Sequence, residues 1–593
     1  MAQHSSNVFQ IKVGGADLAP EVAGALLEAY VEDELNLPDA FELVFRDPMR
    51  TVLAGATFAI GTAITIAVAS ESTPAGAPIF AGEITALEAE IERDRTIAVV
   101  RGFDQAHRLQ RGTTTETHLD VTYGDIVGKV AQRRGLQRGE GGSNTVVHEA
   151  VMQWNQTDWE FLSGLAAEIG HEIVVADSRL HLRQPGDSSS GPQPGDLRSE
   201  DPRQLVAGSN LLRLRATLSG AEQVTEVEVR GWDYKTKEAV KGTAKAADGS
   251  RSASAGSGAA TMATDLDGGT LVKADLPIDS NESAQDAADS LIEQLGSAAA
   301  ELDGVAAGDP ALRAGVMVSL SGVGDTFNGK YVLTSCRHTY DPANGYQTAF
   351  RVSGRQTRTM LGLVRGQGAR GAQEAVRGVV PAIVSNIDDP DSLGRLKVTF
   401  PWLGDNAESH WARVMAVGAG NERGLHVLPE VGDEVLVAFD HGDPRQPYVI
   451  GGLYNGKDKP PVNAVDNGQV IKRAIVSRNG HQVELDDKDD VITIATGDGK
   501  HRLVIDQKNS KVVLDTSGDV EVTAKKKLAV TASDGMSFES QGAFEVKANG
   551  VTIDAGGGAF NAKGSQAKVE GSGTAEISSG GQTTVRGSMV SIN

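Results

Sequence analysis

Short runs of alternating apolar and polar residues recur along the chain, and this two-residue period predicts β-strands with one buried face. In the N-terminal part the period is found at residues 41–46, 64–68, 80–85 and 97–100. Helical patterns are few: residues 123–131, for which we expect Asp125 to be the cap, and residues 163–170, which end on Gly170. The pattern therefore predicts a mainly β protein with small α/β insertions.

A regular apolar repeat fills the last part of the chain. The first four apolar pairs recur every eight residues, and later members continue the pattern: Val520, Val522, Leu528, Val530, Met536, Phe538, Phe544, Val546, Val551, Ile553, Val569, Ile577 and Val585. Such a repeat is typical of a solenoid, in which one unit cannot bury its own apolar face. Three chains wound around one axis would bury these side chains, each contributing roughly 1.5–3 kcal/mol. We predict an intertwined, homotrimeric β-helix with these residues inside.

Between these two parts, four more alternating runs are found at residues 395–400, 411–414, 434–439 and 447–450. Turn-forming residues separate them, including Gly, Asp, Asn and Pro at 389–391, 403–406 and 442–444. Short strands at this spacing favour a small closed barrel.

The same stretch resembles the OB-fold domain of the VgrG / phage tail-spike family. The segments that carry the resemblance are GRLKV at 394–398, FPWL at 400–403, PEVGDEVLV at 429–437, GDP at 442–444 and GLYN at 452–455. The motif residues are Gly394, Phe400, Pro401, Trp402, Trp411, Pro429, Gly432, Asp433, Gly442, Asp443, Pro444, Gly452, Tyr454 and Asn455. The resemblance implies a central spike protein of a contractile injection machine.

Further segments resemble the tail-hub domain of the same family, at residues 157–170, 329–333, 337–341 and 345–350. We expect a double-barrel hub over residues 1–375, an OB-fold domain over 376–460 and a β-helix needle over 461–593. Two Gly- and Ser-rich stretches, 187–201 and 241–264, are interpreted as mobile loops of the hub. The resemblance also implies that two similar barrels per chain match the hexameric rings of an inner tube.

Composition narrows the possible partners. The 593 residues carry a formal charge of −23, which argues against nucleic acid as a partner because phosphate binding needs a basic surface. The single cysteine, Cys336, excludes a disulfide within the chain and suits folding in the bacterial cytoplasm. The first residues do not show the pattern of a signal peptide. The uncharged stretch 51–70 is interpreted as a pair of barrel strands rather than a membrane span.

Candidate chemistry is sparse, and we expect no enzyme activity, catalytic residue, cofactor or metal ligand. The fifteen positions from Asn455 to Val470 are too few for a lysozyme-like domain with two carboxylates. A G-x-G-x-x-G match at 366–371 lacks the strand and helix of a dinucleotide site and is interpreted as a linker. The histidines form no H-x-H or H-x-x-x-H pair, although a metal on a trimer axis stays open.

These observations favour the spike of a phage-tail-like, extracellular or type VI injection system, and the sequence does not decide among the three. Expected partners are two further copies, inner tube and baseplate proteins, the target cell envelope, and a PAAR-type tip protein at the C-terminus, where the strand-like sequence 587–593 would leave open β edges. The alternative is a trimeric β-helical tailspike that binds or cleaves surface polysaccharide. The scarcity of Tyr and Trp after Tyr454 counts against this alternative.

Overall fold

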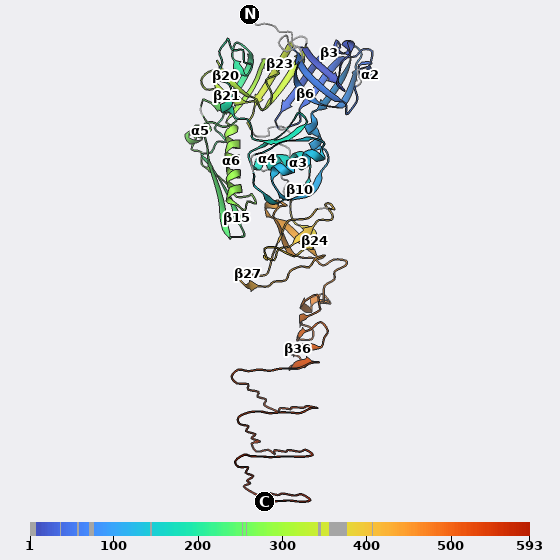
Figure 1. Cartoon of the computed structure of the whole chain (residues 1–593), viewed down its shortest axis with the longest axis vertical. Helices are drawn as coiled ribbons and strands as arrows, with labels where there is room; N and C mark the ends of the chain where they lie inside the picture. Colours follow the sequence, from blue (N-terminus) through green and yellow to red (C-terminus); the bar gives the residue numbers. More distant parts are fainter. Residues whose placement is uncertain are drawn as a thin grey trace. The chain divides into compact units, whose positions relative to one another are not determined.

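The structure is a computed structural model, shown in Figure 1, and its contacts divide the chain into two units, Met1–Pro461 and Val462–Asn593. It describes residues 8–592 apart from 36, 56–57, 70–75, 143–144, 252, 257, 342–344, 355–375 and 406. The G-x-G-x-x-G match at 366–371 and the expected hub boundary at 375 lie outside the described residues.

The first unit is built on an eleven-stranded sheet with the order β14-β19-β23-β22-β3-β4-β7-β6-β5-β1-β2. Its strands are β1 (Val8–Val13), β2 (Ala16–Asp17), β3 (Leu26–Glu34), β4 (Ala40–Arg46), β5 (Ala63–Ala69), β6 (Ala77–Ile91), β7 (Thr96–Phe103), β14 (Leu211–Leu218), β19 (Ala300–Ala307), β22 (Ser335–Asp341) and β23 (Gly345–Val352). Two hydrophobic cores lie against it, one around Phe41 and Ile66 and one around Leu302 and Phe350. The strands expected at 41–46, 64–68, 80–85 and 97–100 are confirmed.

The sheet contains an internal duplication. Its first half contains four strands that come in the sequence order β3, β4, β6 and β7. In the sheet these four lie side by side in the order first, second, fourth, third. β14, β19, β22 and β23 repeat this order, and in both halves the third and fourth strands form a hairpin. Neighbouring strands of these eight are antiparallel throughout, so the two halves run in the same direction. The hub therefore consists of two topologically equivalent halves joined through the β22–β3 pair (Figure 1).

Residues 51–70 are not the expected pair of strands. They contain the single-turn helix α2 (Val52–Gly55) and strand β5, which pairs with β1 and β6. Alternation begins only at Ala63, because Gly55 and Gly61 interrupt the apolar run before it. Among the described residues, no helix is both long enough and apolar enough to cross a membrane.

The first insertion follows β7 and is a small α/β layer. Its elements are η1 (Gln105–Gln110), β8 (Thr114–Val121), α3 (Tyr123–Arg133), β9 (Gln137–Gly141), β10 (His148–Gln156), α4 (Asp158–Glu168), β11 (Glu172–Ala176), β12 (Arg179–Arg183), η2 (Ser188–Ser190) and β13 (Gln204–Val206). The expected cap at Asp125 was wrong by three positions: Thr122 caps α3, and Asp125 completes its capping box. Gly170, with φ of 68°, follows the end of α4 as expected.

The second insertion corrects the loop expected at 241–264. Its elements are β15 (Glu226–Asp233), β16 (Glu238–Lys245), β17 (Ala253–Ala255), α5 (Ala259–Asp265), β18 (Thr270–Lys273) and α6 (Asn281–Ser297), so most of 241–264 is strand or helix. Small residues had suggested low complexity, but here they permit close packing: a Cβ on Gly242 would lie 2.2 Å from the backbone of Ala284 in α6. Within 187–201, Ser188 is buried and donates a hydrogen bond to the carbonyl of Ser250. Strands β20 (Met317–Ser321) and β21 (Gly329–Val332) complete the second half of the hub.

The OB domain closes around one core that it shares with the hub. Its five-stranded sheet has the order β25-β24-β29-β30-β26, formed by β24 (Val380–Asn386), β25 (Lys397–Thr399), β26 (Arg413–Val414), β29 (Glu434–Phe439) and β30 (Pro447–Gly452). A hairpin of β27 (Ala419–Gly420) and β28 (Arg423–Gly424) and the short η3 (Asp440–Gly442) complete it. Met152 and Trp154 of the hub strand β10 pack into this core against Phe400 and Phe439. Strand β24 had no clear alternating pattern and was missed.

The second unit begins with a meander. After β31 (Val465–Asp466) and β32 (Gln469–Val470), the strands β33 (Lys472–Val476), β34 (Gln482–Asp486), β35 (Val491–Ala495), β36 (His501–Asp506) and β37 (Lys511–Thr516) form an antiparallel sheet in sequence order. A turn at 487–490 joins β34 to β35. From 517 to 592 the described chain forms neither helix nor strand within one copy, and Figure 1 draws it as a winding trace.

Three carboxylates lie at the junction between the two halves of the hub: Asp33 and Asp104 are buried, and Asp39 is partly buried. Arg313 pairs with Asp33 and lies 3.8 Å from Asp39, whose backbone carbonyl accepts a hydrogen bond from the Asp104 N–H. Asp104 caps η1, because its Oδ1 accepts from the Ala106 N–H at 3.1 Å. Burial is the main cause that raises the pKa of Asp104 to about 7, and the nearby Asp33 charge adds to it. Asp104 is therefore protonated in the folded hub at acidic pH.

Asp104→Asn should raise the thermal unfolding midpoint at pH 8, and the gain should shrink as the pH falls from 7 towards 4. The folded pKa lies above the ordinary value of 3.8, so this group favours folding at low pH and loses that contribution as the pH rises to about 7. The difference at pH 8 is bounded by about 4 kcal/mol. Calorimetry across this pH range checks it, with the exposed Asp94→Asn as control. An equal gain at pH 4 and pH 8 would contradict a buried ionised group.

Candidate functional site: the exposed apolar stripe and the OB domain

The meander of the second unit exposes its apolar face. Ile475, Val483, Ile494, Leu503 and Leu514 lie directly opposite one another on successive strands. A second row runs beside the first through Leu485, Ile492, Ile505 and Val512. All of these side chains except Leu503 are exposed, up to 68% for Val512. The sheet thus presents two continuous apolar rows that its own chain does not cover.

The opposite face of this meander is the more polar and the less exposed of the two. Lys472 on β33 forms ion pairs with Glu484 at 2.8 Å and Asp486 at 3.0 Å on the neighbouring strand. These hydrogen bonds raise the pKa of Lys472 to about 12. A sheet in water normally hides its apolar side chains and solvates its charged ones. This sheet has the reverse arrangement, as expected for a part of a larger assembly.

The thirteen residues predicted to line the needle lie farther along the chain, and we call them the stripe. Each is exposed in the single chain, from 49% at Met536 to 85% at Ile577. Among the described residues of 518–592, one backbone–backbone hydrogen bond is formed in a turn or loop: the Gly558 N–H donates to the Ala555 carbonyl. Apolar side chains and backbone groups therefore both lack partners inside one copy. Their inward position in a trimer stays a prediction.

The OB motif residues lie in the barrel and at its turns. Phe400 is buried in the core, and Trp402 is half-exposed with its Nε1 donating to the Pro381 carbonyl at 2.8 Å. Three motif glycines, Gly394, Gly432 and Gly442, adopt positive φ, which explains their residue type. Pro401 lies in a turn, Pro429 and Asp433 lie in the turn before β29, and Asp443 and Pro444 precede β30, which ends at Gly452. The ring of Trp411 lies 5.3 Å from the Lys397 Nζ. Tyr454 is exposed, and the Asn455 side chain donates a hydrogen bond to Glu434.

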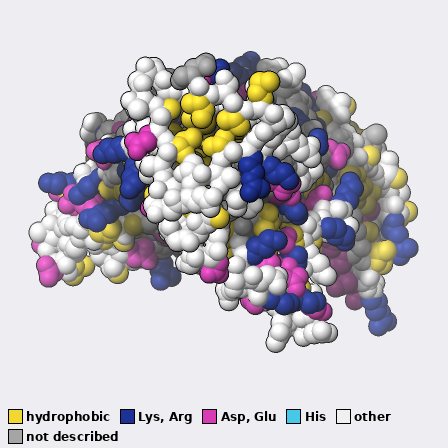
Figure 2. Space-filling view, turned by 90° about the horizontal axis from the view of Figure 1, so that it is seen from below, with side chains coloured by type: hydrophobic (Ala, Val, Ile, Leu, Met, Phe, Trp, Pro, Cys, Tyr) yellow, Lys and Arg dark blue, Asp and Glu magenta, His cyan; other side chains and the backbone are white. Residues whose placement is uncertain are grey.

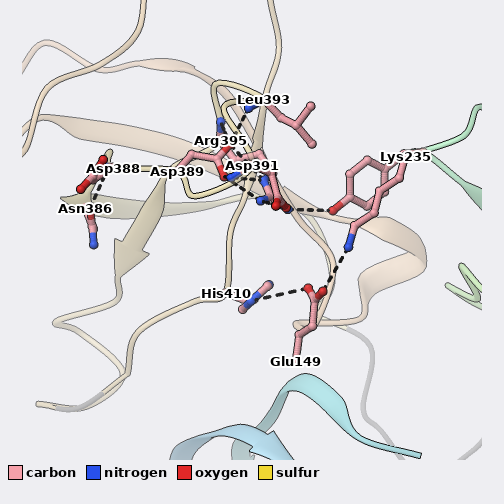
Figure 3. Close-up of polar contacts among 10 residues, drawn as sticks. Glu149, Lys235, Asn386, Asp388, Asp389, Asp391, Leu393, Arg395 and His410 are labelled. Carbon is pink, nitrogen blue, oxygen red and sulfur yellow. Dashed lines mark hydrogen bonds and ion pairs between the residues drawn. The ribbon is translucent and has the colours of Figure 1, made fainter.

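The first turn of the OB domain is held by one arginine. Arg395, which is 2% exposed, donates to both carboxylate oxygens of Asp389 and to Asp391. Its Nη1 also donates to the Tyr234 hydroxyl of the hub at 3.0 Å, from the turn between β15 and β16 (Figure 3). The hydrogen bonds from Arg395 are the main cause that holds the pKa of Asp389 well below its usual range. Nearby, Lys235 and His410 both approach Glu149 of β10 (Figure 3).

A second arginine, just before β30, also joins the OB domain to the hub. Arg445, directly after the Asp443–Pro444 motif, donates to both carboxylate oxygens of Glu168 at 3.0 Å and to Asp443 at 2.6 Å. Its Nη1 also donates to the Tyr123 hydroxyl at 3.3 Å. Burial would lower the pKa of Arg445, but the charges of Asp443 and Glu168 raise it further, so the guanidinium stays charged. Bidentate pairing to a carboxylate is a geometry that lysine does not offer.

Stacking strengthens the same interface. The Arg413 guanidinium on β26 lies 4.9 Å from the ring of Tyr234 and 5.5 Å from that of Tyr448. The three contacts of Arg395, Arg413 and Arg445 form what we call the hub–OB clasp. Sequence reasoning stopped at Pro444 and missed these arginines, although an Arg directly after the motif and an Arg in two of the four predicted strands, 395–400 and 411–414, were visible signals.

These features define a class: a β-rich protein with a duplicated hub, an OB domain and a C-terminal unit whose apolar side chains are exposed in one copy. Residues 380–454 match the type VI secretion system/phage-baseplate injector OB domain. Residues 4–341 match the Alg8 N-terminal domain, over more than half of the chain. The chain belongs to the Alg8 N-terminal domain family.

Similar proteins carry related names. In Vibrio cholerae serotype O1, the actin cross-linking toxin VgrG1 is 40% identical over 75 residues and the type VI secretion system spike protein VgrG3 is 38% identical over 81 residues. These matches cover 12% and 13% of this chain and only 7% and 8% of the relatives. A chain of the half-lidded Francisella PdpA–VgrG complex shares the fold at a TM-score of 0.50, with 9% identity, over 86% of this chain and 88% of that chain. The predicted VgrG-like resemblance and mainly β fold are confirmed.

Arg445→Ala should destabilise the first unit by about 3–5 kcal/mol, because it leaves Asp443 and Glu168 facing each other at a partly buried interface. Arg445→Lys should recover only part of this loss, since it keeps the charge but not the paired donors. Thermal unfolding of the full chain checks both variants. The matched control is Arg423→Ala in the exposed β28. A midpoint equal to that of the control would show that the clasp does not hold the domains.

Proposed function

We propose that this chain is the central spike protein of a contractile injection system, acting as a homotrimer that caps the inner tube and pierces a target envelope. The observation that carries the proposal is the second unit: two apolar rows on the meander and the stripe of thirteen apolar side chains beyond it, of which all but Leu503 are exposed in one copy. At roughly 1.5–3 kcal/mol per buried side chain, covering the stripe in a trimer would favour association strongly.

A spike must transmit an axial load without bending, and we infer that two features serve this purpose. A β-helix of three chains would pair the backbone groups along 517–592, so that bending would break hydrogen bonds at every level. The hub–OB clasp would carry load between the hub and the OB domain, because Arg395, Arg413 and Arg445 each contact a side chain of the hub. Figure 3 shows the side of the clasp at Arg395.

Mechanical rather than catalytic action is part of the proposal. VgrG3 and related proteins are named spike proteins, and the toxin name of VgrG1 is attached to a protein of which 7% is matched here. Among the described residues, no group of three or more His, Cys, Asp or Glu side chains is arranged to hold a metal ion. The comparisons favour the spike over the polysaccharide-binding tailspike, because the matched relatives include several type VI spike proteins.

We propose inner tube and baseplate proteins as partners of the hub, whose two equivalent halves per chain would present six similar units in a trimer. Nucleic acid is not among the proposed partners. The formal charge is −23, and Figure 2 shows basic and acidic side chains interspersed over the face that it draws. A PAAR-type tip protein is the proposed partner of the last residues, where Met589 and Ile592 are highly exposed.

Light scattering of the full chain should give the mass of three copies, about 186 kDa from 62.0 kDa per chain. Val530→Asp should abolish the heat-resistant trimer, because it would bring three carboxylates together in an apolar axis. The matched control is Thr531→Asp, at the neighbouring polar position. A monomeric parent chain would overturn the spike, and a variant as heat-stable as the parent would overturn the position of Val530 in the stripe.

Removal of residues 578–593 should detach the tip protein while the trimer persists, since most of the stripe precedes Ile577. Purified particles with and without the truncation can be compared by quantitative mass spectrometry. Unchanged amounts of tip protein would contradict attachment at these residues.

A further inference from the structure

Two strands of the hub sheet have an unpaired edge. β14 is the last strand on one side of the eleven, and among the described residues its Leu212–Leu218 part pairs only with β19. β6 pairs with β5 through residues 77–83 and with β7 through residues 83–91. Beyond Ile84 the side of β6 that faces away from β7 therefore has no strand in the described chain. Exposed edges of this kind are templates for pairing with another chain.

The chain itself contains a template for how such edges pair. At the junction of the two halves, the third strand of one half, β22, lies antiparallel to the first strand of the other, β3. Cys336, His338 and Tyr340 face Asp33, Val31 and Ala29 towards the core. On the outer face Arg337 forms an ion pair with Glu32 across the same junction, at 2.9 Å.

In the duplicated hub, β6 occupies the place of β22, and β14 the place of β3. Equivalent residues of the two halves are matched by comparing one row of paired residues that crosses the four strands of each half. Ala29, Leu43, Val100 and Leu87 pair in succession across the first half. Leu214, Gly304, Phe350 and Cys336 pair in the same way across the second. Leu87 is therefore the equivalent of Cys336, and Leu214 the equivalent of Ala29.

We propose that β6 of one copy pairs antiparallel with β14 of a second copy, as β22 pairs with β3 inside the chain, and that three such junctions close the hub into a ring. If β6 and β14 pair with the same register as β22 and β3, the following residues lie opposite one another: Leu87 and Leu218, Ala89 and Ala216, and Ile91 and Leu214. The proposal rests on the homotrimer of the proposed function and assigns the residues through which its hubs join.

This register follows from strand pairing alone, and the side chains that it places opposite one another are complementary on both faces of the sheet. All three inward pairs are apolar, and Ile91, which is 54% exposed in the single chain, would be covered. On the outer face the same register places Glu90 opposite Arg215 and Glu92 opposite Arg213. These four residues are exposed, and none of them forms an ion pair with another described residue. Opposite charges directly across antiparallel strands stabilise the pair.

A shift of one residue would lose this agreement. Ile91 would then face Arg213 or Arg215, and glutamates would face Leu214 or Ala216. A slip of one residue exchanges the two faces of a strand, so the apolar and charged matches together exclude such a slip. The contact is heterologous, because different strands meet, and such contacts close into a ring when the rotation fits.

Cysteine cross-linking tests the register in the full-length trimer. Ala89→Cys combined with Ala216→Cys should form a disulfide between copies on mild oxidation, seen as a covalent trimer on a non-reducing gel. Paired positions place Cβ atoms within disulfide reach. The control, Ala89→Cys with Thr217→Cys, points one thiol to the opposite face and should stay largely unlinked; the natural Cys336 is buried. Absence of the cross-link in a chain of trimer mass by light scattering would overturn the junction and leave the spike intact.

A charge exchange provides an independent measurement. Glu90→Arg or Arg215→Glu alone should weaken association of hubs truncated after Pro461, provided that this unit is folded by circular dichroism. The double variant should restore the association. We expect a ten-fold weakening or more for each single variant in sedimentation at low salt, largely lost at 0.5 M salt because exposed charges are screened. Single variants that associate like the parent hub, or a double variant that is not rescued, would overturn the proposed pairing.

Discussion

Apolar surface that one chain cannot cover is the constraint on which the second unit depends. In the meander, charged side chains occupy the less exposed face and two rows of Ile, Leu and Val occupy the more exposed one. Over 517–592 even the backbone has no strand partner in its own copy. Unpaired backbone groups and exposed apolar side chains are each unfavourable, and both are satisfied at once by identical neighbours. In the proposed trimer, association would therefore be a condition of folding for residues 517–592, whereas the first unit has its own cores.

The first unit solves a different problem, which is to join two domains in one fixed orientation by adding directional contacts to the apolar core that they share. Its clasp uses arginine three times, in each case with a carboxylate or with tyrosine rings. Arginine keeps its charge even when buried, and its fixed fork of donors defines direction as well as distance. Buried ion pairs add little net stability compared with apolar packing, but breaking one is costly. Such contacts define one relative position of the hub and the OB domain and penalise others.

Much of this architecture could be predicted from the sequence, because alternation reports a strand with one buried face. That rule located β4, β5, β7, β29 and β30, and the OB motif gave the barrel. It failed for β24 and for residues 241–264, where small residues mean tight packing rather than a loop. The clasp could not be predicted, since Arg445 and Glu168 are 277 positions apart and only the fold brings them together. The duplication of the hub was expected only from the family resemblance, because it lies in strand order and register and not in a repeated residue pattern.

The meander of β33–β37 also has a consequence for the order of events during synthesis. Each of its strands pairs with the next one along the chain, so it can form from local hairpins in microseconds without waiting for another copy. Residues 517–592 have no such local pairing and depend on encounter between chains. Three preformed meanders, brought together by their apolar faces, would align the registers of these later residues. Assembly would then nucleate near Lys472 and proceed as a zipper towards Ile592, which makes the meander the step at which a misaligned trimer can still be corrected.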